Sequence, residues 1–292
     1  MSANRARRAR LDSLLVERGL VESRTRAQAI ILAGRVLVRG RMVDKASALI
    51  EVDAEIECPS GDEWVSRGAF KLLHALERFP LTVAGRTALD AGASTGGFTE
   101  VLLRAGATRV YAVDVGYGQL SWKLRTDPRV VVYERTNVRY LNDLPERASL
   151  VVADLSFISL TLVLGRLVAL AEPDADFILL VKPQFEAGRA EVGKGGVVRD
   201  PVIHRAVLEK TTAAAETHGL QLHGATASPI LGPAGNVEFL AWYSHGEAAL
   251  EPAAHLDRAL AEAATITRLK PDDAPTPGSA PDPANATHGA AR

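Results

Sequence analysis

Residues 87–106 read TALDAGASTGGFTEVLLRAG, which is an apolar strand, a glycine-rich turn and a helix followed by a glycine. Glycines let the backbone of such a turn approach a ligand, and the first turn of the helix offers unpaired N–H groups. The alternation continues downstream, with an apolar helix expected over 160–171 and strands expected over 109–116, 129–136, 150–157 and 176–183. Strands that alternate with helices predict a doubly wound α/β fold with a mostly parallel sheet.

Two acidic residues beside the glycine turn indicate which ligand it holds. Asp90 ends the strand before the turn, and Asp114 ends the next strand, where an acidic side chain can bind a ribose diol. The glycines follow G-x-x-x-G-G and not the G-x-G-x-x-G of a dinucleotide site, and Asp90 suits a sulfonium and an amino group better than a pyrophosphate. We therefore predict S-adenosylmethionine as the cofactor, in preference to NAD or to a turn with only a packing role. The predicted cofactor-binding residues are Asp90, Gly92, Ser94, Thr95, Gly96, Gly97, Phe98, Thr99, Asp114, Val115, Asn137 and Asp154.

The charge of the chain is divided unevenly along its length. The 292 residues contain 34 Lys and Arg against 35 Asp and Glu, yet residues 1–45 hold 11 basic and four acidic residues. That is a net charge of +7, which leaves −8 for the remainder, and a basic module of this kind suggests a polyanionic partner. Cys58 is the only cysteine, so no internal disulfide and no cysteine-based zinc site can form. We expect a cytoplasmic protein with no metal site, no signal peptide and no membrane helix.

The basic N-terminal module has a recognisable pattern. RLDSLLVERGL (10–20) and the run after Ser23 predict two helices, and short strands are expected around Arg39-Gly40. Residues Arg10 to Val43 resemble the ribosomal-protein-S4-type RNA-binding domain, which implies that arginines here contact RNA phosphates. On composition alone, a solvated arginine surface is the alternative. The predicted RNA-binding residues are Arg8, Arg10, Arg24, Arg26, Arg35, Arg39, Arg41 and Arg67.

Four charged residues stand at positions that favour catalysis. Lys71 lies four residues after Arg67 on an expected helix, and this like-charged spacing calls for an anionic neighbour. Asp154 ends one apolar strand, and Lys182 ends the most apolar strand of the chain. Glu238 is the single acid in the strand-like run NVEFLAWY. In open α/β sheets, the carboxyl ends of the strands border the ligand crevice.

Together these residues resemble the Lys-Asp-Lys-Glu tetrad of the FtsJ-like RNA ribose 2′-O-methyltransferases. The surrounding runs SRGAFKL, LDAGASTGGFT, DLSFISL, LLVKPQFE and GNVEF are similar to the TlyA/hemolysin A family, over about Arg10 to Tyr243. The resemblance implies a class I, Rossmann-like S-adenosylmethionine-dependent methyltransferase sheet and a small α+β RNA-binding domain before it. It implies methylation of the ribose 2′-OH of cytidines in ribosomal RNA of the small or large subunit. One departure is Asp62-Glu63 before Trp64-Val65, where a basic residue is expected.

The chemistry assigns a role to each member of the tetrad. A ribose hydroxyl must lose its proton as the methyl group arrives, and a neutral lysine can accept it; burial and a second cation both favour the neutral form. Lys182, with Lys71 nearby, is the favoured base, and Lys71 is the alternative. Asp154 orients Lys182, and Glu238 holds Lys71 or the ribose. Two other functions remain open, a non-catalytic RNA-binding factor and a membrane-active protein, as the hemolysin label suggests.

The domain organisation follows from these assignments. We expect an RNA-binding domain with a basic arm (1–58), a linker (59–66), an FtsJ-like methyltransferase domain (67–246), a helical extension (247–270) and a disordered tail (271–292). The expected partners are ribosomal RNA and ribosomal subunits, with no membrane, and the protein is expected to be a monomer. The Gly-rich segment 188–199 is either an RNA-contacting flap or a plain loop. Trp122 is expected in the core, and His204 on the surface.

Overall fold

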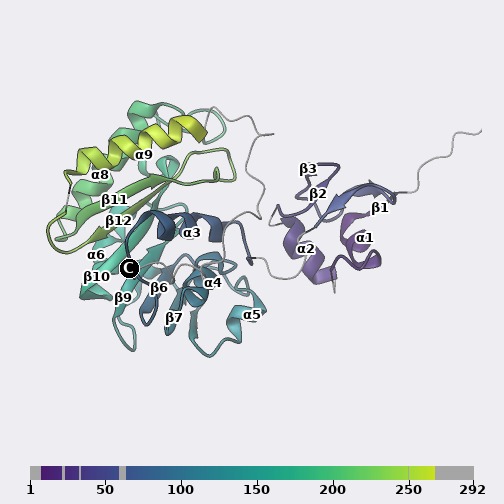
Figure 1. Cartoon of the computed structure of the whole chain (residues 1–292), viewed down its shortest axis with the longest axis horizontal. Coiled ribbons are helices and arrows are strands. Elements are labelled where there is room, and N and C mark those ends of the chain that lie inside the picture. Colours follow the sequence, from purple (N-terminus) through teal and green to yellow (C-terminus); the bar gives the residue numbers. More distant parts are fainter. Residues whose placement is uncertain (1–7, 22–23, 33, 59–63, 249, 267–292) are drawn as a thin grey trace, which may run out of the picture. The chain divides into compact units, whose positions relative to one another are not determined.

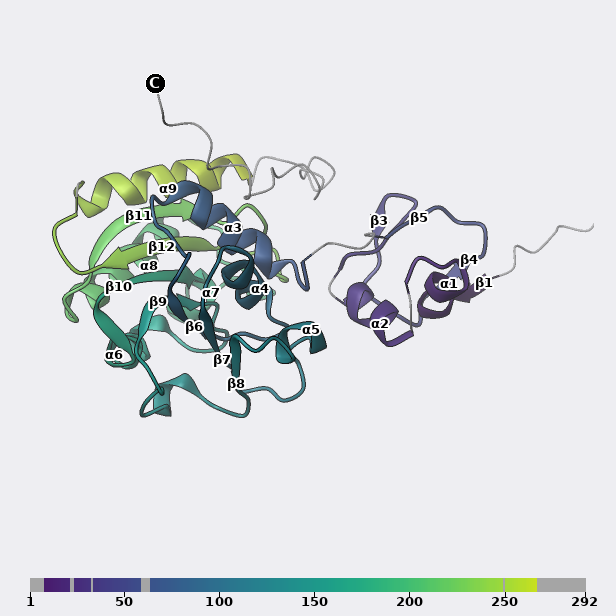
Figure 2. The same ribbon diagram turned by 60° about the horizontal axis from the view of Figure 1, so that its bottom comes forward.

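The computed structural model divides into two compact units, Met1–Ala69 and Phe70–Arg292. It describes residues 8–21, 24–32, 34–58, 64–248 and 250–266. The predicted tail 271–292 and most of the predicted linker 59–66 lie outside the described residues. Most elements of both units are labelled in Figure 1, and Figure 2 adds labels for β4, β5, β8 and α7.

The first unit is a small α+β domain, as the sequence predicts. Its elements are β1 (Arg8–Arg10), α1 (Leu11–Glu17), α2 (Arg24–Leu32), β2 (Leu37–Val38), β3 (Arg41–Met42), β4 (Leu49–Glu51) and β5 (Ile56–Glu57). Strand β1 pairs with β4, and β2 lies between β3 and β5, all antiparallel. Arg39 and Gly40 join β2 to β3 with φ values of 51° and 73°, and two positive φ values are typical of a tight hairpin turn. The core joins the apolar faces of α1 and α2 through Leu11, Leu15, Ala27, Ile30, Ile31 and Val36.

The second unit is built on a seven-stranded sheet of order β11-β12-β10-β9-β6-β7-β8. Its strands are β6 (Thr87–Ala91), β7 (Arg109–Val113), β8 (Val130–Tyr133), β9 (Ala148–Ala153), β10 (Ala171–Val181), β11 (Gln221–Ala227) and β12 (Phe239–Ser244). The first five are parallel, and β12 runs antiparallel to both β10 and β11. Because the chain leaves β6 for β7 on one side and later returns to β9 on the other, the strand order reverses between β6 and β9. This reversal point is where open α/β sheets bind ligands.

Helices cover both faces of this sheet, which confirms the predicted doubly wound α/β fold. The helical elements are α3 (Gly68–Arg78), α4 (Gly97–Arg104), α5 (Trp122–Arg125), η1 (Val138–Tyr140), η2 (Leu160–Leu162), α6 (Leu164–Ala169), α7 (Pro183–Glu186), α8 (Pro201–Glu216) and α9 (Pro252–Ile266). One core joins alternate strand residues such as Phe177 and Phe239 to α6, α8 and α9. Helices α3 and α4 lie on the other face in both ribbon views (Figures 1 and 2). Strands covered on both faces explain the continuous apolar run at 177–181.

The structure corrects three expectations. The predicted helix 160–171 is two shorter elements, η2 and α6, and β10 already begins at Ala171. At the start of this segment, the buried carboxylate of Glu186 accepts a hydrogen bond from the backbone N–H of Leu160. Trp122 is 75 % exposed at the start of the short helix α5, because Leu124 takes the buried position there. His204 is buried, and its Nε2 lies 3.0 Å from the carbonyl oxygen of Val198. A local pattern cannot show which side of a short helix will meet the sheet.

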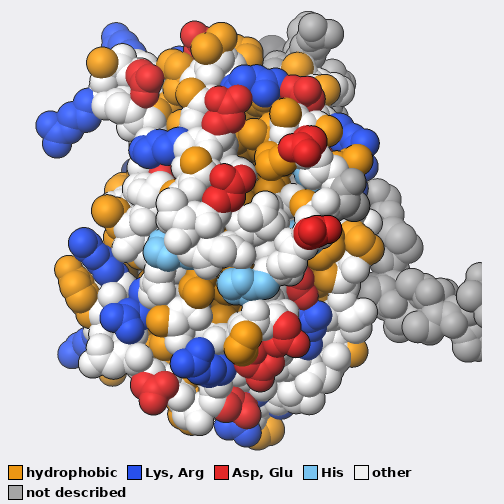
Figure 3. Space-filling model, turned by 90° about the vertical axis from the view of Figure 1, so that its left-hand side faces the viewer, with side chains coloured by type: hydrophobic (Ala, Val, Ile, Leu, Met, Phe, Trp, Pro, Cys, Tyr) orange, Lys and Arg blue, Asp and Glu red, His pale blue; other side chains and the backbone are white. Residues whose placement is uncertain are grey.

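Among the described residues, no helix is both long and apolar enough to cross a bilayer. On the face drawn in Figure 3, basic and acidic side chains are interspersed rather than separated by sign.

Candidate active site

The four candidate catalytic residues reach the same edge of the sheet. Asp154 directly follows β9, and Lys182 directly follows β10. Glu238 directly precedes β12, and because that strand is antiparallel, with Phe239 opposite Val181, its start lies beside the end of β10. Lys71 comes from the first turns of α3. The antiparallel strand is therefore what brings the last acid of the tetrad to the carboxyl edge.

These side chains form a chain of alternating charges. The Nζ atom of Lys71 lies 2.6 Å from Oε2 of Glu238 and 3.6 Å from Oδ2 of Asp154. The Nζ atom of Lys182 lies 2.5 Å from Oδ1 of Asp154. Lys71 and Lys182 are each 7 % exposed, and Glu238 is 1 % exposed. The structure thus brings together all four predicted catalytic residues, and the anionic neighbours expected for Lys71 are present.

The ion pairs set the protonation states within this chain. Burial favours the neutral form of Lys71, but Asp154 and Glu238 outweigh it and raise the lysine's pKa above its usual value. Burial also favours the neutral form of Asp154, which would raise the pKa of its carboxyl. The charges of Lys71 and Lys182 outweigh burial and lower that pKa. Lys71 therefore stays protonated and Asp154 stays ionised near neutral pH. Lys71 pairs with two carboxylates, whereas Lys182 pairs with one among the described residues, so Lys71 is the less suited of the two to accept a proton.

The glycine-rich turn lies directly against this cluster. Gly92 has a φ of 89°, and a Cβ atom there would stand 2.5 Å from the carbonyl oxygen of Asp154. Gly96 has a φ of 99°, and its Cβ would stand 2.2 Å from the side chain of Leu124. The first glycine lets the turn approach Asp154, while the second makes room for α5. Gly97 begins α4, where it is buried together with Phe98 and Thr99.

A small hollow is lined in part by residues of the same turn. Its lining residues are Ala93, Ser94, Ala112, Asp114, Gly116, Gln119, Leu120, Val132 and Glu134. Asp114 accepts hydrogen bonds from the backbone N–H groups of Ser94 (2.8 Å) and Gly116 (2.6 Å), so its carboxylate is fixed at the rim. Glu134 accepts from the N–H of Gly118 at 2.8 Å. The carboxylates of two neighbouring strand ends therefore border one hollow.

Some predicted cofactor residues stand away from the hollow. Val115 is 67 % exposed and does not line it. Asn137 is exposed and caps η1, where its side chain accepts from the N–H of Arg139. Thr95 is exposed, and its carbonyl oxygen accepts from the N–H of Ser121. Seven lining residues were missed, because they come from three segments that no single motif joins: Ala93, Ala112, Gly116, Gln119, Leu120, Val132 and Glu134.

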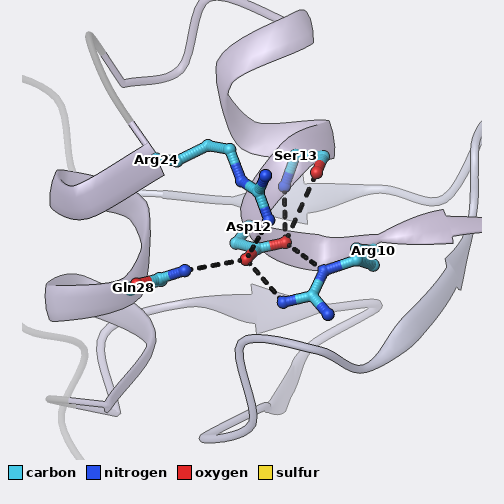
Figure 4. A network of polar contacts seen from close by, with 5 residues as sticks. All are labelled: Arg10, Asp12, Ser13, Arg24 and Gln28. Atoms are coloured by element: carbon cyan, nitrogen blue, oxygen red, sulfur yellow. Dashed lines mark hydrogen bonds and ion pairs between the residues drawn. The ribbon is translucent and has the colours of Figure 1, made fainter.

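The predicted RNA-binding arginines form separate small groups. Arg10 and Arg24 both bind the carboxylate of Asp12 (Figure 4). Arg8 and Arg39 both pair with Glu51, and Arg35 donates to the carbonyl oxygen of Trp64. Arg41 is exposed, and Arg67 lies near Gly34. The side chain of Arg26 lies outside the described residues.

Comparison with known proteins identifies both units. Residues 64–245 match the FtsJ-like methyltransferase family, and residues 9–56 match the S4 domain. The 16S/23S rRNA (cytidine-2′-O)-methyltransferase TlyA of Mycobacterium tuberculosis is 53 % identical over 81 % of this chain and 90 % of its own length. The chain belongs to the TlyA family of FtsJ-like methyltransferases. Hemolysin A of Brachyspira hyodysenteriae, another relative, is 40 % identical over 80 % of this chain and 99 % of its own.

A solved structure agrees with this family assignment. A provisionally named hemolysin from Streptococcus thermophilus superposes with a TM-score of 0.70 at 40 % identity, and the match covers 90 % of this chain and 98 % of the other. The TlyA-family resemblance inferred from the motifs is thus confirmed, as is the methyltransferase fold with its N-terminal S4 domain.

The TlyA-family site also contains side chains that the sequence did not single out. Ser156 accepts a hydrogen bond from Nζ of Lys182 at 2.9 Å. Phe157 is 91 % exposed and has a φ of 63°. The centre of its ring lies 5.1 Å from the centre of the Phe185 ring, and the Phe185 ring centre lies 5.9 Å from Nζ of Lys182. A bulky residue at positive φ is uncommon and often marks a functional site. The run DLSF could have signalled them, since Ser156 and Phe157 closely follow Asp154.

The hydrogen bonding of Asp90 indicates whether this site suits a cationic ligand. Its carboxyl is fully buried; Oδ2 accepts from the hydroxyl of Thr99 at 2.6 Å, while Oδ1 has no hydrogen-bond partner among the described residues. Burial, together with the charges of Asp154 and Asp114, raises the pKa of Asp90 to about 7. A buried acid with an unused oxygen gains from a positive group nearby. The residues present therefore fit a sulfonium-bearing cofactor.

Proposed function

We propose that this protein transfers a methyl group from S-adenosylmethionine to the ribose 2′-hydroxyl of a cytidine in ribosomal RNA. The observation that carries the proposal is the buried Lys71–Glu238 and Asp154–Lys182 chain beside the glycine turn. The activity named for the M. tuberculosis relative, at 53 % identity, supports the same substrate class. In this reaction one positive charge leaves the sulfur and one arrives on Nζ of Lys182, so the net charge at the crevice does not change.

We assign cofactor binding to the hollow and the turn. Asp114, fixed by two backbone N–H groups, would accept hydrogen bonds from the ribose hydroxyls, and Gly92 would lie beneath the methionine portion. Asp90 would supply the negative charge that a cationic ligand needs. When bound, S-adenosylmethionine supplies an electrophilic methyl group on a positively charged sulfur.

Lys182 is the proposed general base. Its amine would accept the proton of the 2′-hydroxyl as the oxygen–methyl bond forms, so the proton ends on Nζ. There it faces Asp154 at 2.5 Å, whose lowered pKa keeps it ionised, so the new ammonium is paired at once. The hydroxyl of Ser156 fixes Nζ from a second direction. Proton transfer to a positioned base of this kind typically contributes about 10²–10⁴ in rate.

Lys71 and Glu238 are the proposed positioning pair. Lys71 remains a cation and binds the second oxygen of Asp154, which leaves the first oxygen for Lys182. Glu238 holds Lys71 at 2.6 Å and is itself enclosed, because a Cβ atom at Gly232 would meet its Oε1 at 2.5 Å. These contacts leave Lys182 as the favoured base, as the sequence suggested.

The RNA would be anchored by the S4 domain and read at the site by shape. Every ribonucleotide has a 2′-hydroxyl, so the pocket alone cannot choose a position. A base that leaves its stack needs a surface to lie against, and the exposed ring of Phe157 offers one beside Lys182. A non-catalytic RNA-binding role or a membrane-active role is not favoured, since neither needs three buried charges gathered around the half-buried Asp154.

The test is methyl transfer from labelled S-adenosylmethionine to purified small and large ribosomal subunits, with the modified nucleotide mapped. We expect a 2′-O-methylcytidine that is absent with the Lys182→Ala variant. Lys45→Ala, which removes an exposed lysine of the first unit, is the matched control and should remain within a few fold of wild type. Labelling of a base atom or of protein, or equal labelling by the Lys182 variant, would contradict the proposal.

A further inference from the structure

Asp12 is a buried acid surrounded by cationic side chains (Figure 4). Its exposed fraction is 0 %, although it lies in the second position of α1 in a small domain. Its Oδ1 accepts from Nε of Arg10 at 2.9 Å and from its neighbour's N–H, and its Oδ2 accepts from Arg10, Arg24 and Gln28 at 2.8, 3.1 and 3.0 Å. The carboxylate therefore gathers side chains from β1 and α2 around a single point.

Both arginines keep unused donors. Arg10 spends Nε and one terminal nitrogen on Asp12, and Arg24 spends one terminal nitrogen, out of five N–H donors each. Among the described residues, neither guanidinium has another side-chain partner. The Arg10 side chain is 45 % exposed and that of Arg24 is 57 % exposed. The remaining donors are thus available to a ligand from solvent.

The geometry brings the two cations together in spite of their repulsion. A terminal nitrogen of each arginine bonds to the same Oδ2 atom, so the two nitrogens are separated by no more than the sum of those two bond distances. Hydrogen bonds from Arg10, assisted by Gln28 and Arg24, outweigh burial and hold the pKa of Asp12 well below its usual range. The group of three is therefore permanently charged, with one positive charge in excess.

We propose that Asp12 is a positioning residue that holds Arg10 and Arg24 as a preformed pair for a backbone phosphate of the RNA substrate. The proposal rests on the proposed function, because it presumes that RNA is what the first unit binds. Phosphate is the ligand class because two adjacent guanidinium forks match its oxygens and its charge. Such a contact fixes register and orientation and reads no base. Preformed orientation lowers the ordering cost that free surface arginines would bear on binding.

The decisive comparison is between Asp12→Asn and Glu17→Gln in the full-length protein. Both variants remove one negative charge from α1, but Glu17 is exposed and its side chain forms no hydrogen bond or ion pair with the described residues. If only bulk charge matters, both should bind purified ribosomal subunits slightly more tightly. If Asp12 positions the arginines, Asp12→Asn should bind about tenfold more weakly, as expected for a lost charge-assisted hydrogen bond, and Glu17→Gln should not. Binding by Asp12→Asn equal to that of Glu17→Gln would overturn the proposal.

Kinetics provide a readout that loss of folding would not mimic. With small and large subunits as substrates, Asp12→Asn should raise KM and leave kcat and the binding of S-adenosylmethionine within about twofold. A variant that lowers kcat with KM unchanged would argue against a binding role. If wild type binds subunits but methylates neither, the proposed function fails while the binding comparison still decides the role of Asp12. If wild type binds neither subunit, the phosphate assignment fails.

A second variant serves if Asp12→Asn does not fold, as circular dichroism would reveal. Arg24→Lys keeps the charge at an exposed position but removes the planar fork. We expect it to bind subunits several-fold more weakly with an unchanged dependence on salt. Wild-type affinity for this variant would mean that a point charge suffices, and the preformed pair would have to be abandoned.

Discussion

Asp12 in the first unit and Asp90 in the second are both completely buried, yet their surroundings shift their pKa values in opposite directions. Asp12 is bonded by two arginines, of which Arg10 is the main cause, and its pKa falls well below the usual range. Among the described residues, Asp90 is hydrogen-bonded by Thr99 and pairs with no cation, and burial raises its pKa to about 7. Asp12 is bonded by two positive charges, one more than neutralises it, whereas Asp90 is bonded by no positive charge among the described residues.

This difference indicates the charge of the ligand that each unit binds. A buried acid with surplus arginines presents cationic donors to an anion, which fits RNA phosphate. A buried acid with a free oxygen favours a cationic group, which fits a sulfonium. The tetrad stands between these extremes, because its lysines and its acids lie paired with one another. The uncompensated charge in each cluster is thus opposite in sign to the charge of its proposed ligand.

The largest expected effect falls on the balanced cluster. Lys182→Ala should lower methyl transfer to ribosomal subunits by about 10²–10⁴-fold, because the general base is lost. Affinity for the subunits should change only a few fold, since the proposed RNA anchors lie in the other unit. Single-turnover methylation and filter binding measure the two quantities. A near wild-type rate would remove Lys182 from the mechanism and make the tetrad a structural cluster only.

Breaking an ion pair should cost far more stability in the tetrad than in the Asp12 cluster. Glu238→Gln leaves Lys71 with one distant carboxylate, and removing one partner of a buried pair costs about 3–5 kcal/mol. Arg24→Gln leaves Asp12 with both bonds from Arg10, so about 0–1 kcal/mol should be lost at this exposed site. Urea unfolding measures both. Equal losses would mean that the two clusters do not differ in the way proposed.

Asp90→Asn should stabilise the ligand-free protein in a pH-dependent way. A native pKa of about 7, above the unfolded value, means that wild type loses stability as pH rises from about 4 to about 7. The asparagine has no such loss, so its advantage should grow over that window to at most about 4 kcal/mol. Unfolding in urea at about pH 5 and about pH 8 tests this. The variant should at the same time bind S-adenosylmethionine more weakly, and an unaltered affinity would contradict the proposed role of the free oxygen.

The smallest expected effect concerns the salt dependence of RNA binding. Arg24→Gln removes one proposed phosphate contact, so the slope of log affinity against log salt should decrease by about one unit. Catalysis at saturating RNA should be unaffected. Titrations of ribosomal subunits over a range of salt concentrations measure the slope. Lys45→Gln, at an exposed lysine of the same unit, is the control and should leave the slope nearly unchanged.

The sequence by itself determined the layers of the fold and the members of the tetrad. Apolar runs such as 177–181 and the glycine turn after Asp90 are local patterns, and local patterns fix strands, helices and the ends of both. Because parallel strands end at one edge, the strand pattern alone places Asp154 and Lys182 near each other. Glu238 could be assigned only by resemblance, since a single acid in a strand is ordinarily a surface residue.

Only the tertiary structure decided which charges meet and what they do to one another. The antiparallel pairing of β12 with β10 brings Glu238 within 2.6 Å of a lysine that lies 167 residues earlier. The complete burial of Asp12 and Asp90 is equally invisible in the sequence, although the sequence did mark Asp90 as a candidate cofactor-binding residue. Desolvation and Coulomb energies depend on distances through space and on access of water. The protonation state of each group therefore emerges only when the chain is folded.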